Sequence, residues 1–199
     1  MKRMFPGGPA IIVASFLLMT SVLGAQPLGH TTSAERLKTA FTSLKAAPTS
    51  RSAQHRYLKA FPHSYKGFQA YFGRGGALAD GYECDYIFAL STLQSHHVAE
   101  VGSLLVQLSK DAEYQGNAPS CLRNVMANYG SHFTKSFAGL LHQLPSQERA
   151  QLIAFLADVG SGTAHDYQGI IQNLKTLNEP ELVKEFQQAQ LERSRQSHK

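Results

Sequence analysis

Histidines that stand near carboxylates are the residues of this sequence best suited to chemistry. His96 and Glu100 are four positions apart, so in a helix they would share one face and could supply two ligands to a metal ion. Their spacing is neither the H-E-x-x-H of zinc proteases nor the E-x-x-H of di-iron bundles. A solvent-exposed start of a helix also explains His96, His97 and Glu100, and we therefore expect no metal site.

A serine, a histidine and an aspartate in the last quarter of the chain suggest hydrolase chemistry. Ser161 lies in a Gly-Ser-Gly loop shortly before His165 and Asp166, and these are the residue types of a catalytic triad. Adjacent residues of a helix point in different directions, however, and the G-x-S-x-G turn that exposes a nucleophilic serine is absent. Asp166 is more simply a first-turn carboxylate that the helix dipole stabilises. We expect no catalytic residue and no cofactor.

The segment 61–76 combines aromatic side chains with a glycine-rich turn. Five rings lie within twelve residues, and they are Phe61, Tyr65, Phe68, Tyr71 and Phe72. The turn Gly73-Arg74-Gly75-Gly76 could bind an anion through its N–H groups, but it lacks the Lys-Ser/Thr of a P-loop and is interpreted as a connection between helices. Core packing explains the rings; if some are exposed, together with Arg74 they have the composition of a protein-binding hot spot. The candidate partner-binding residues are Phe68, Tyr71, Phe72 and Arg74.

Helices must position these residues, because apolar side chains recur at helical spacing along most of the chain and no segment indicates a strand. We predict an all-α, single-domain bundle of seven to nine helices over residues 26–186. The polar C-terminal tail, residues 187–199, is expected to fray.

Local signals predict the ends of several helices. Thr32 and Ser64 stand where N-caps are expected, and Gly73 would end a short helix in a left-handed conformation. The longest helix is expected to begin at Pro119 or Ser120 and to end at Leu144. Gly130 would bend this helix near its middle.

The first 25 residues have the pattern of a secretory signal peptide. Lys2 and Arg3 form a basic start, and an uncharged apolar run follows from Ala10 to Leu23, which is too short for a comfortable membrane span. No cysteine stands near the expected cleavage site, as a lipoprotein would require. We therefore expect residues 1–25 to be removed and the protein to be periplasmic or secreted, with no stable membrane span.

Cys84 and Cys121 are the only cysteines of the chain. An exported protein folds in an oxidising compartment, so a structural disulfide between them is the favoured interpretation. A pair of free buried thiols is the alternative. A redox-active or metal-binding pair would require the C-x-x-C spacing, which is absent.

Composition and charge exclude several classes of protein. An apolar fraction of 43% with 17% charged residues excludes disordered and collagen-like chains. Without Lys2 and Arg3, 17 basic and 14 acidic side chains remain, and the basic ones look scattered along the sequence. Nucleic acids require a dense basic cluster, so we do not expect one as a partner.

Two stretches resemble a group of uncharacterised exported helical proteins of Gram-negative bacteria. The segment 61–73 is similar to their FPxSFxxFxxxYG pattern, and Phe155 to Gly160 with Tyr167 is similar to their FxxDGxxxxxY region, with Val159 inserted between Asp158 and the glycine. The resemblance implies an exported helical bundle and carries no activity. By type, small exported helical proteins with one disulfide also resemble the immunity proteins that protect bacteria from periplasmic toxins.

Two functions are compatible with these features. The first is an exported, non-enzymatic periplasmic binding protein with a protein partner in the cell envelope, for which an immunity-type inhibitor of a secreted toxin is one form. The alternative is a small periplasmic hydrolase or metal-dependent enzyme that uses its histidines, chiefly His96, His97, His132 and His165. We favour the binding protein, because no catalytic constellation accompanies the histidines. The sequence leaves the identity of the partner and the oligomeric state open.

Overall fold

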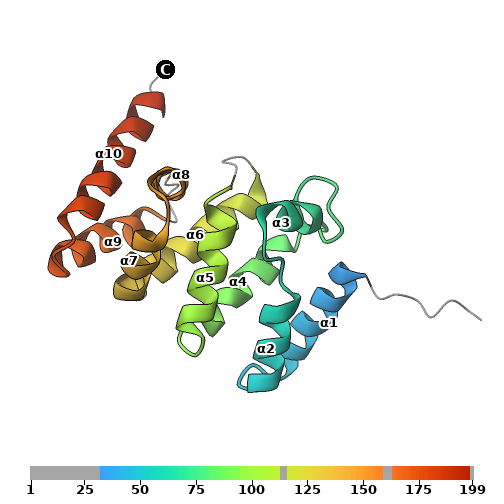
Figure 1. The fold of residues 1–199 in the computed structure, drawn as a ribbon. Helices are drawn as coiled ribbons and strands as arrows, with labels where there is room; N and C mark the ends of the chain where they lie inside the picture. Colours follow the sequence, from blue (N-terminus) through green and yellow to red (C-terminus); the bar gives the residue numbers. More distant parts are fainter. Residues whose placement is uncertain (1–31, 113–115, 159–162, 198–199) are drawn as a thin grey trace, which may run out of the picture. The chain divides into compact units, whose positions relative to one another are not determined.

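The computed structural model describes residues 32–112, 116–158 and 163–197, and all of its regular elements in these ranges are α-helices (Figure 1). The ten helices of the described residues are α1 (Ser33–Ala46), α2 (Arg51–Ala60), α3 (Tyr65–Phe72), α4 (Glu83–Leu93), α5 (Val98–Ser109), α6 (Asn117–His132), α7 (Thr134–Gln143), α8 (Ser146–Ala157), α9 (Ala164–Thr176) and α10 (Pro180–Ser197). The predicted all-α class is therefore confirmed. The predicted signal peptide, residues 1–25, lies outside the described residues. Within the described ranges, no helix combines the length and the apolar character that crossing a bilayer requires.

The predicted number of helices, seven to nine, is too low because one long helix is in fact two. The chain leaves the helical conformation at Phe133, which has φ −120° and ψ 40° and separates α6 from α7. The hydroxyl of Thr134 donates hydrogen bonds to the carbonyl oxygens of Gly130 and Ser131, at 2.8 and 3.0 Å. Such side-chain bonds to the preceding turn compete with the helical pattern. The break therefore follows Gly130 instead of being a bend centred on it.

The predicted N-caps of α1 and α3 are confirmed. The Thr32 hydroxyl oxygen accepts a hydrogen bond from the N–H of Glu35 at 3.2 Å, and that of Ser64 accepts one from Gly67 at 3.1 Å. The predicted left-handed end of α3 is wrong, because Gly73 is extended, with φ −71° and ψ 173°. Positive φ values occur later in the connection to α4, at Gly75 with φ 76° and at Gly81 with φ 87°.

The prediction of a frayed tail from residue 187 is wrong for the described part of that segment, because α10 continues to Ser197. Gln188 donates a hydrogen bond to the carboxylate of Glu192 one turn later, at 2.7 Å. Arg193 donates from Nε to the Asp158 carboxylate at the end of α8, also at 2.7 Å. This tertiary anchor lies beyond residue 186, and the polar composition of the segment does not indicate it.

The core is one continuous apolar cluster to which every described helix contributes, and α5 and α6 each pack against five other helices. α6 packs against α4, α5, α7, α8 and α9. Buried tyrosines link helices through their hydroxyls: Tyr129 donates to the Val98 carbonyl at 3.0 Å and Tyr167 to the Phe186 carbonyl at 2.7 Å. Burial raises the pKa of both hydroxyls, so each stays protonated as a hydrogen-bond donor.

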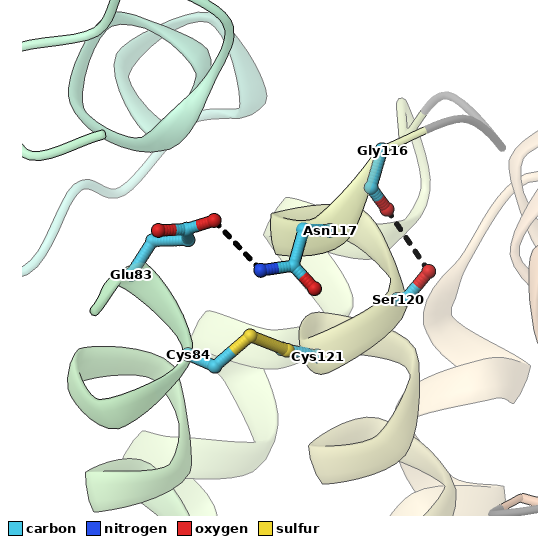
Figure 2. The surroundings of a disulfide bond; sticks show 6 residues. All are labelled: Glu83, Cys84, Gly116, Asn117, Ser120 and Cys121. Carbon is cyan, nitrogen blue, oxygen red and sulfur yellow. Dashed lines mark hydrogen bonds between the residues drawn. A yellow bond between two sulfur atoms is a disulfide. The ribbon is translucent and has the colours of Figure 1, made fainter. Parts of the chain in front are cut away.

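Cys84 of α4 and Cys121 of α6 lie at disulfide distance, as predicted, with their Cα atoms 5.6 Å apart (Figure 2). The pair joins the first turn of α4 to the second turn of α6. Beside it, the Asn117 side chain donates a hydrogen bond to the Glu83 carboxylate at 2.7 Å, and this bond is the main cause that lowers the pKa of Glu83. The starts of α4 and α6 are therefore linked by a covalent and a polar contact.

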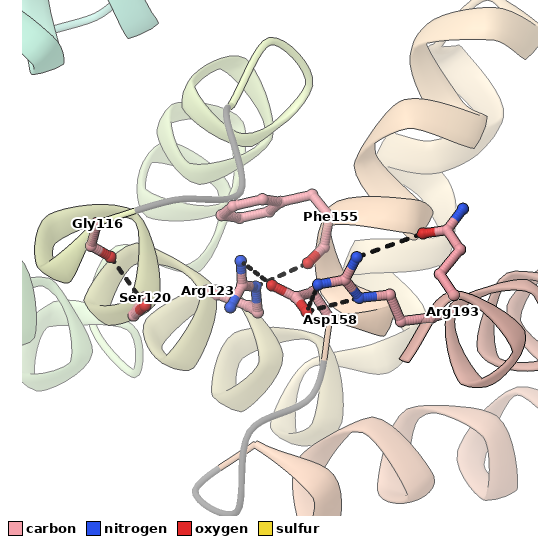
Figure 3. A network of polar contacts seen from close by, with 7 residues as sticks. Gly116, Ser120, Arg123, Phe155, Asp158 and Arg193 are labelled. Atoms are coloured by element: carbon pink, nitrogen blue, oxygen red, sulfur yellow. Dashed lines mark hydrogen bonds and ion pairs between the residues drawn. The ribbon is translucent and has the colours of Figure 1, made fainter. Parts of the chain in front are cut away.

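An ionic network connects α6, the end of α8 and α10 (Figure 3). Arg123 of α6 is buried; its Nε donates to the Phe155 carbonyl at 2.8 Å, and its guanidinium lies 4.8 Å from the centre of the Phe155 ring. The same guanidinium pairs with the Asp158 carboxylate at 2.9 Å. The other oxygen of Asp158 accepts the bond from Arg193. One carboxylate therefore pairs with two arginines, of which one is buried.

Gly102 of α5 lies where α5 passes close to α6. A Cβ atom added at Gly102 would lie 2.1 Å from the hydroxyl oxygen of Tyr129 and 3.0 Å from a methyl carbon of Leu140. The Tyr129 ring is fully buried and hydrogen-bonded, so it has little freedom to move away. A glycine is therefore required here by space, in the middle of a helix where it lowers helical stability.

We expect Gly102→Ala to lower the free energy of unfolding by about 2 kcal/mol, because overpacking outweighs the gain in helix propensity. Gly139 of α7 provides the matched control, since an added Cβ there meets nothing within 4 Å. Gly139→Ala should raise stability by about 0.5–1 kcal/mol. Urea unfolding of both variants measures the two shifts, and shifts of the same sign would contradict the close contact at Gly102.

Candidate functional site

A groove between the first three helices has a volume of about 610 Å³. We call it the α1–α3 groove, and its lining consists of Ser33, Arg36, Thr39, Ala40, Ser43, Arg56, Lys59, Ala60, Phe61 and Tyr71. α1 and α2 pack directly against each other and supply most of this lining. Phe61 follows α2, and Tyr71 comes from the last turn of α3.

The α1–α3 groove is positively charged. Arg36 on α1 and Arg56 with Lys59 on α2 are exposed, and no acidic residue is among the lining residues. None of the ion pairs within the described residues involves these three cations. Their charge is therefore available to a bound anion.

The charge of the groove belongs to a wider asymmetry of the chain. Residues 33–72 contain seven Lys and Arg against one acidic residue, Glu35, whereas residues 73–199 contain ten basic and thirteen acidic residues. Burial raises the pKa of Tyr86, and the charges of Asp80 and Glu35 raise it further, which places Glu35 close to α4. The impression of scattered basic residues is therefore wrong: the positive charge is concentrated in α1–α3, and a charge count by segment would have indicated this.

Two aromatic residues of the groove lining, Phe61 and Tyr71, pack against further aromatic rings. Phe61 is buried, with its ring centre 5.7 Å from that of Phe72 and 5.8 Å from that of Tyr57. Tyr71 is half-buried, and its ring meets Phe72 edge-on at 6.0 Å. Because these rings pack against one another, the apolar end of the groove is preformed.

Only part of the predicted partner-binding cluster can reach a partner. Phe68 and Phe72 are buried, at 0% and 4% exposure, so core packing explains these two rings and the conditional assignment to an exposed hot spot does not hold for them. Tyr65, Phe68 and Phe72 lie on one face of α3, which faces the core, while Tyr71 lies beside that face. Tyr71 lines the α1–α3 groove, and Arg74 is exposed in the loop after α3.

The predicted helical face with His96 and Glu100 does not form. α5 begins only at Val98, so His96 lies in the turn before it, and the residue next to Glu100 is His97, with Nδ1 at 3.3 Å from the carboxylate. The other ring nitrogen of His97 is 3.1 Å from the side-chain oxygen of Gln54 on α2. In the part of the chain that the structure describes, no three His, Cys, Asp or Glu side chains are arranged to hold a metal ion.

The other two histidines of the enzymatic alternative, His132 and His165, lie on different helices, α6 and α9. His132, at the end of α6, shares a hydrogen bond of 3.0 Å between Nδ1 and the Asn128 carbonyl. His165, at the start of α9, is 98% exposed, with Nδ1 3.7 Å from the Asp166 carboxylate. Ser161, the serine of the considered triad, lies outside the described residues. Neither of these two contacts joins His132 or His165 to another histidine.

Comparison of the chain with protein-family models, with curated proteins and with solved structures finds no match. The function of the α1–α3 groove is therefore inferred from its own residues. Those residues combine three cations, three hydroxyls and an apolar floor on adjacent helices, which is a combination suited to binding an amphipathic anion.

Proposed function

We propose that this protein is an exported, non-enzymatic binding protein whose α1–α3 groove binds the acidic surface of a protein partner in the cell envelope. The observation that carries the proposal is the groove lining, in which Arg36, Arg56 and Lys59 face no acidic residue. An immunity-type inhibitor that occludes part of a secreted toxin is one form of this function. The apolar N-terminal run and the cysteine pair support export to an oxidising compartment.

Electrostatic complementarity explains why the charge is gathered on one part of the chain. A patch of one sign accelerates the encounter with an oppositely charged partner and disfavours partners of like charge. Tyr71 adds an amphipathic ring beside the cations, and tyrosine and arginine are enriched at the energetically dominant positions of protein interfaces. The charge of the groove can therefore accelerate the encounter with an acidic partner, and its residues supply contact area for that partner.

The test is affinity capture with the protein expressed from its full sequence and recovered from the periplasm. A stoichiometric partner should be retained by the parent protein and reduced about tenfold or more by Arg56→Glu combined with Lys59→Glu, because both cations of α2 are reversed. Lys135→Glu combined with Lys175→Glu is the matched control, since it makes the same change of net charge at exposed positions of α7 and α9.

The partner is identified by mass spectrometry, and the intact mass of the recovered protein reports whether residues 1–25 have been removed. Equal capture by the groove variant and by the control variant would show that the α1–α3 groove is not the binding site. Recovery of the whole chain from the cytoplasm alone would overturn the proposed export.

A further inference from the structure

The α1–α3 groove is elongated along α1. Its lining residues on that helix include Ser33, Arg36 and Ser43, which follow one another at intervals that return to the same side of an α-helix. From Ser33 to Ser43 the helix rises by about 15 Å, at 1.5 Å per residue. A single inorganic anion would occupy only a fraction of this length.

Cations line the groove on both sides. Arg36 comes from α1, and Arg56 and Lys59 come from α2, three residues apart and therefore on one side of that helix. A guanidinium group binds a carboxylate through two parallel hydrogen bonds. Carboxylates spaced along an extended chain could thus meet cations of both helices at the same time.

The remaining lining suits a polypeptide backbone and an apolar side chain. The hydroxyls of Ser33 and Thr39 can donate to or accept from backbone amides, whereas that of Ser43 donates to the Thr39 carbonyl at 3.0 Å and can accept from a ligand amide. Between the cations, Ala40 and Ala60 leave a shallow apolar floor, and Tyr71 stands at the α3 side. Small residues in the floor leave room for the side chain of a ligand.

We infer that the α1–α3 groove binds a short acidic peptide segment of its protein partner in an extended conformation, with one apolar side chain above Ala40 and Ala60. A length of about 15 Å accommodates four or five extended residues at about 3.3 Å each. The inference rests on the proposed function, because it specifies which part of the partner enters the groove. It also predicts that a free peptide of this kind competes with the partner.

The direct test uses the fluorescein-labelled peptide Glu-Glu-Leu-Glu-Glu and the whole exported protein, with binding followed by fluorescence anisotropy at low ionic strength. Arg56→Glu with Lys59→Glu should weaken binding of the peptide about tenfold or more, and Lys135→Glu with Lys175→Glu should leave it within about twofold. Arg56→Gln with Lys59→Gln should give an intermediate loss. The peptide in which glutamine replaces each glutamate should bind at least about tenfold more weakly to the parent protein.

Two further arms distinguish the peptide from other anions. Inorganic phosphate and vesicles of phosphatidylglycerol are each added as competitors. Displacement of the peptide by phosphate at equal charge concentration, or stronger binding to vesicles than to the peptide, would overturn the inference. Equal binding of the peptide to the groove variant and to the control variant would overturn it as well.

The same peptide separates this inference from the proposed function. If a partner is captured through the groove but excess Glu-Glu-Leu-Glu-Glu does not displace it, the inference of an acidic segment in the groove is wrong. The proposed binding function stands in that case. If capture is insensitive both to the groove variant and to the peptide, both proposals fail. Displacement of the captured partner by the peptide, together with loss of capture in the groove variant, supports both proposals.

Discussion

Removal of the cysteine pair by Cys84→Ser with Cys121→Ala is expected to lower the free energy of unfolding by about 4 kcal/mol. The two cysteines are 37 positions apart, and in the chain-entropy model a cross-link over a loop of this length removes roughly that much conformational freedom from the unfolded chain. Alanine is chosen at Cys121 because this side chain is 6% exposed, and a serine hydroxyl would need a partner there. Guanidinium unfolding, with the midpoint and slope fitted together, measures the change.

A reducing agent provides the control for this prediction. It should destabilise the parent protein to the level of the double variant and leave the double variant unchanged. A loss below about 1 kcal/mol would mean that the cross-link removes little conformational freedom from the unfolded chain, although it joins cysteines 37 positions apart. In that case the unfolded chain would retain structure between the cysteines.

Features encoded by neighbouring residues could be predicted from the sequence. The N-caps at Thr32 and Ser64 depend on a hydroxyl and an N–H three positions later, which a sequence displays directly. The all-α class depends on helical spacing of apolar residues. The pairing of Cys84 with Cys121 could be predicted because the chain has two cysteines and an oxidising compartment was expected.

Features that depend on distant residues could not be predicted in the same way. The α1–α3 groove forms where one side of α1 lies beside one side of α2. The spacing of residues within each helix does not predict which sides of the two helices lie together. The burial of Phe68 and Phe72 had a local signal, since they lie four apart on the face that also carries Tyr65. Tyr71 lies off that face, which explains why it is the one aromatic residue of α3 in the groove lining.

The ionic network is the clearest long-range feature. Asp158 pairs with Arg123, 35 positions before it, and with Arg193, 35 positions after it, and no spacing rule joins these residues. The extension of α10 beyond residue 186 also depends on a contact between distant residues. Arg193 pairs with Asp158 and so anchors a segment whose composition alone predicts fraying. The polar tail is therefore helical as a result of tertiary structure.

Asp158→Ala is expected to lower the free energy of unfolding by about 3 kcal/mol. The side chain of Arg123 is 7% exposed, and removal of the carboxylate that pairs with a buried charge is far more costly than removal of a surface ion pair. Arg193→Ala should cost less than about 1 kcal/mol, because its side chain is 38% exposed and solvent screens its charge. Urea unfolding of Asp158→Ala and of Arg193→Ala measures the two losses of stability. Their difference shows how much of the contribution of Asp158 does not depend on Arg193.

The double variant Arg123→Met with Asp158→Ala decides what the network contributes. Methionine fills much of the volume of the arginine stem without a buried charge, so this variant should recover part of the stability that Asp158→Ala alone loses. A double variant less stable than Asp158→Ala would show that Arg123 acts chiefly through its bond to the Phe155 carbonyl and its contact with the Phe155 ring. Equal losses for Asp158→Ala and Arg193→Ala would instead place the main energetic link between α8 and α10.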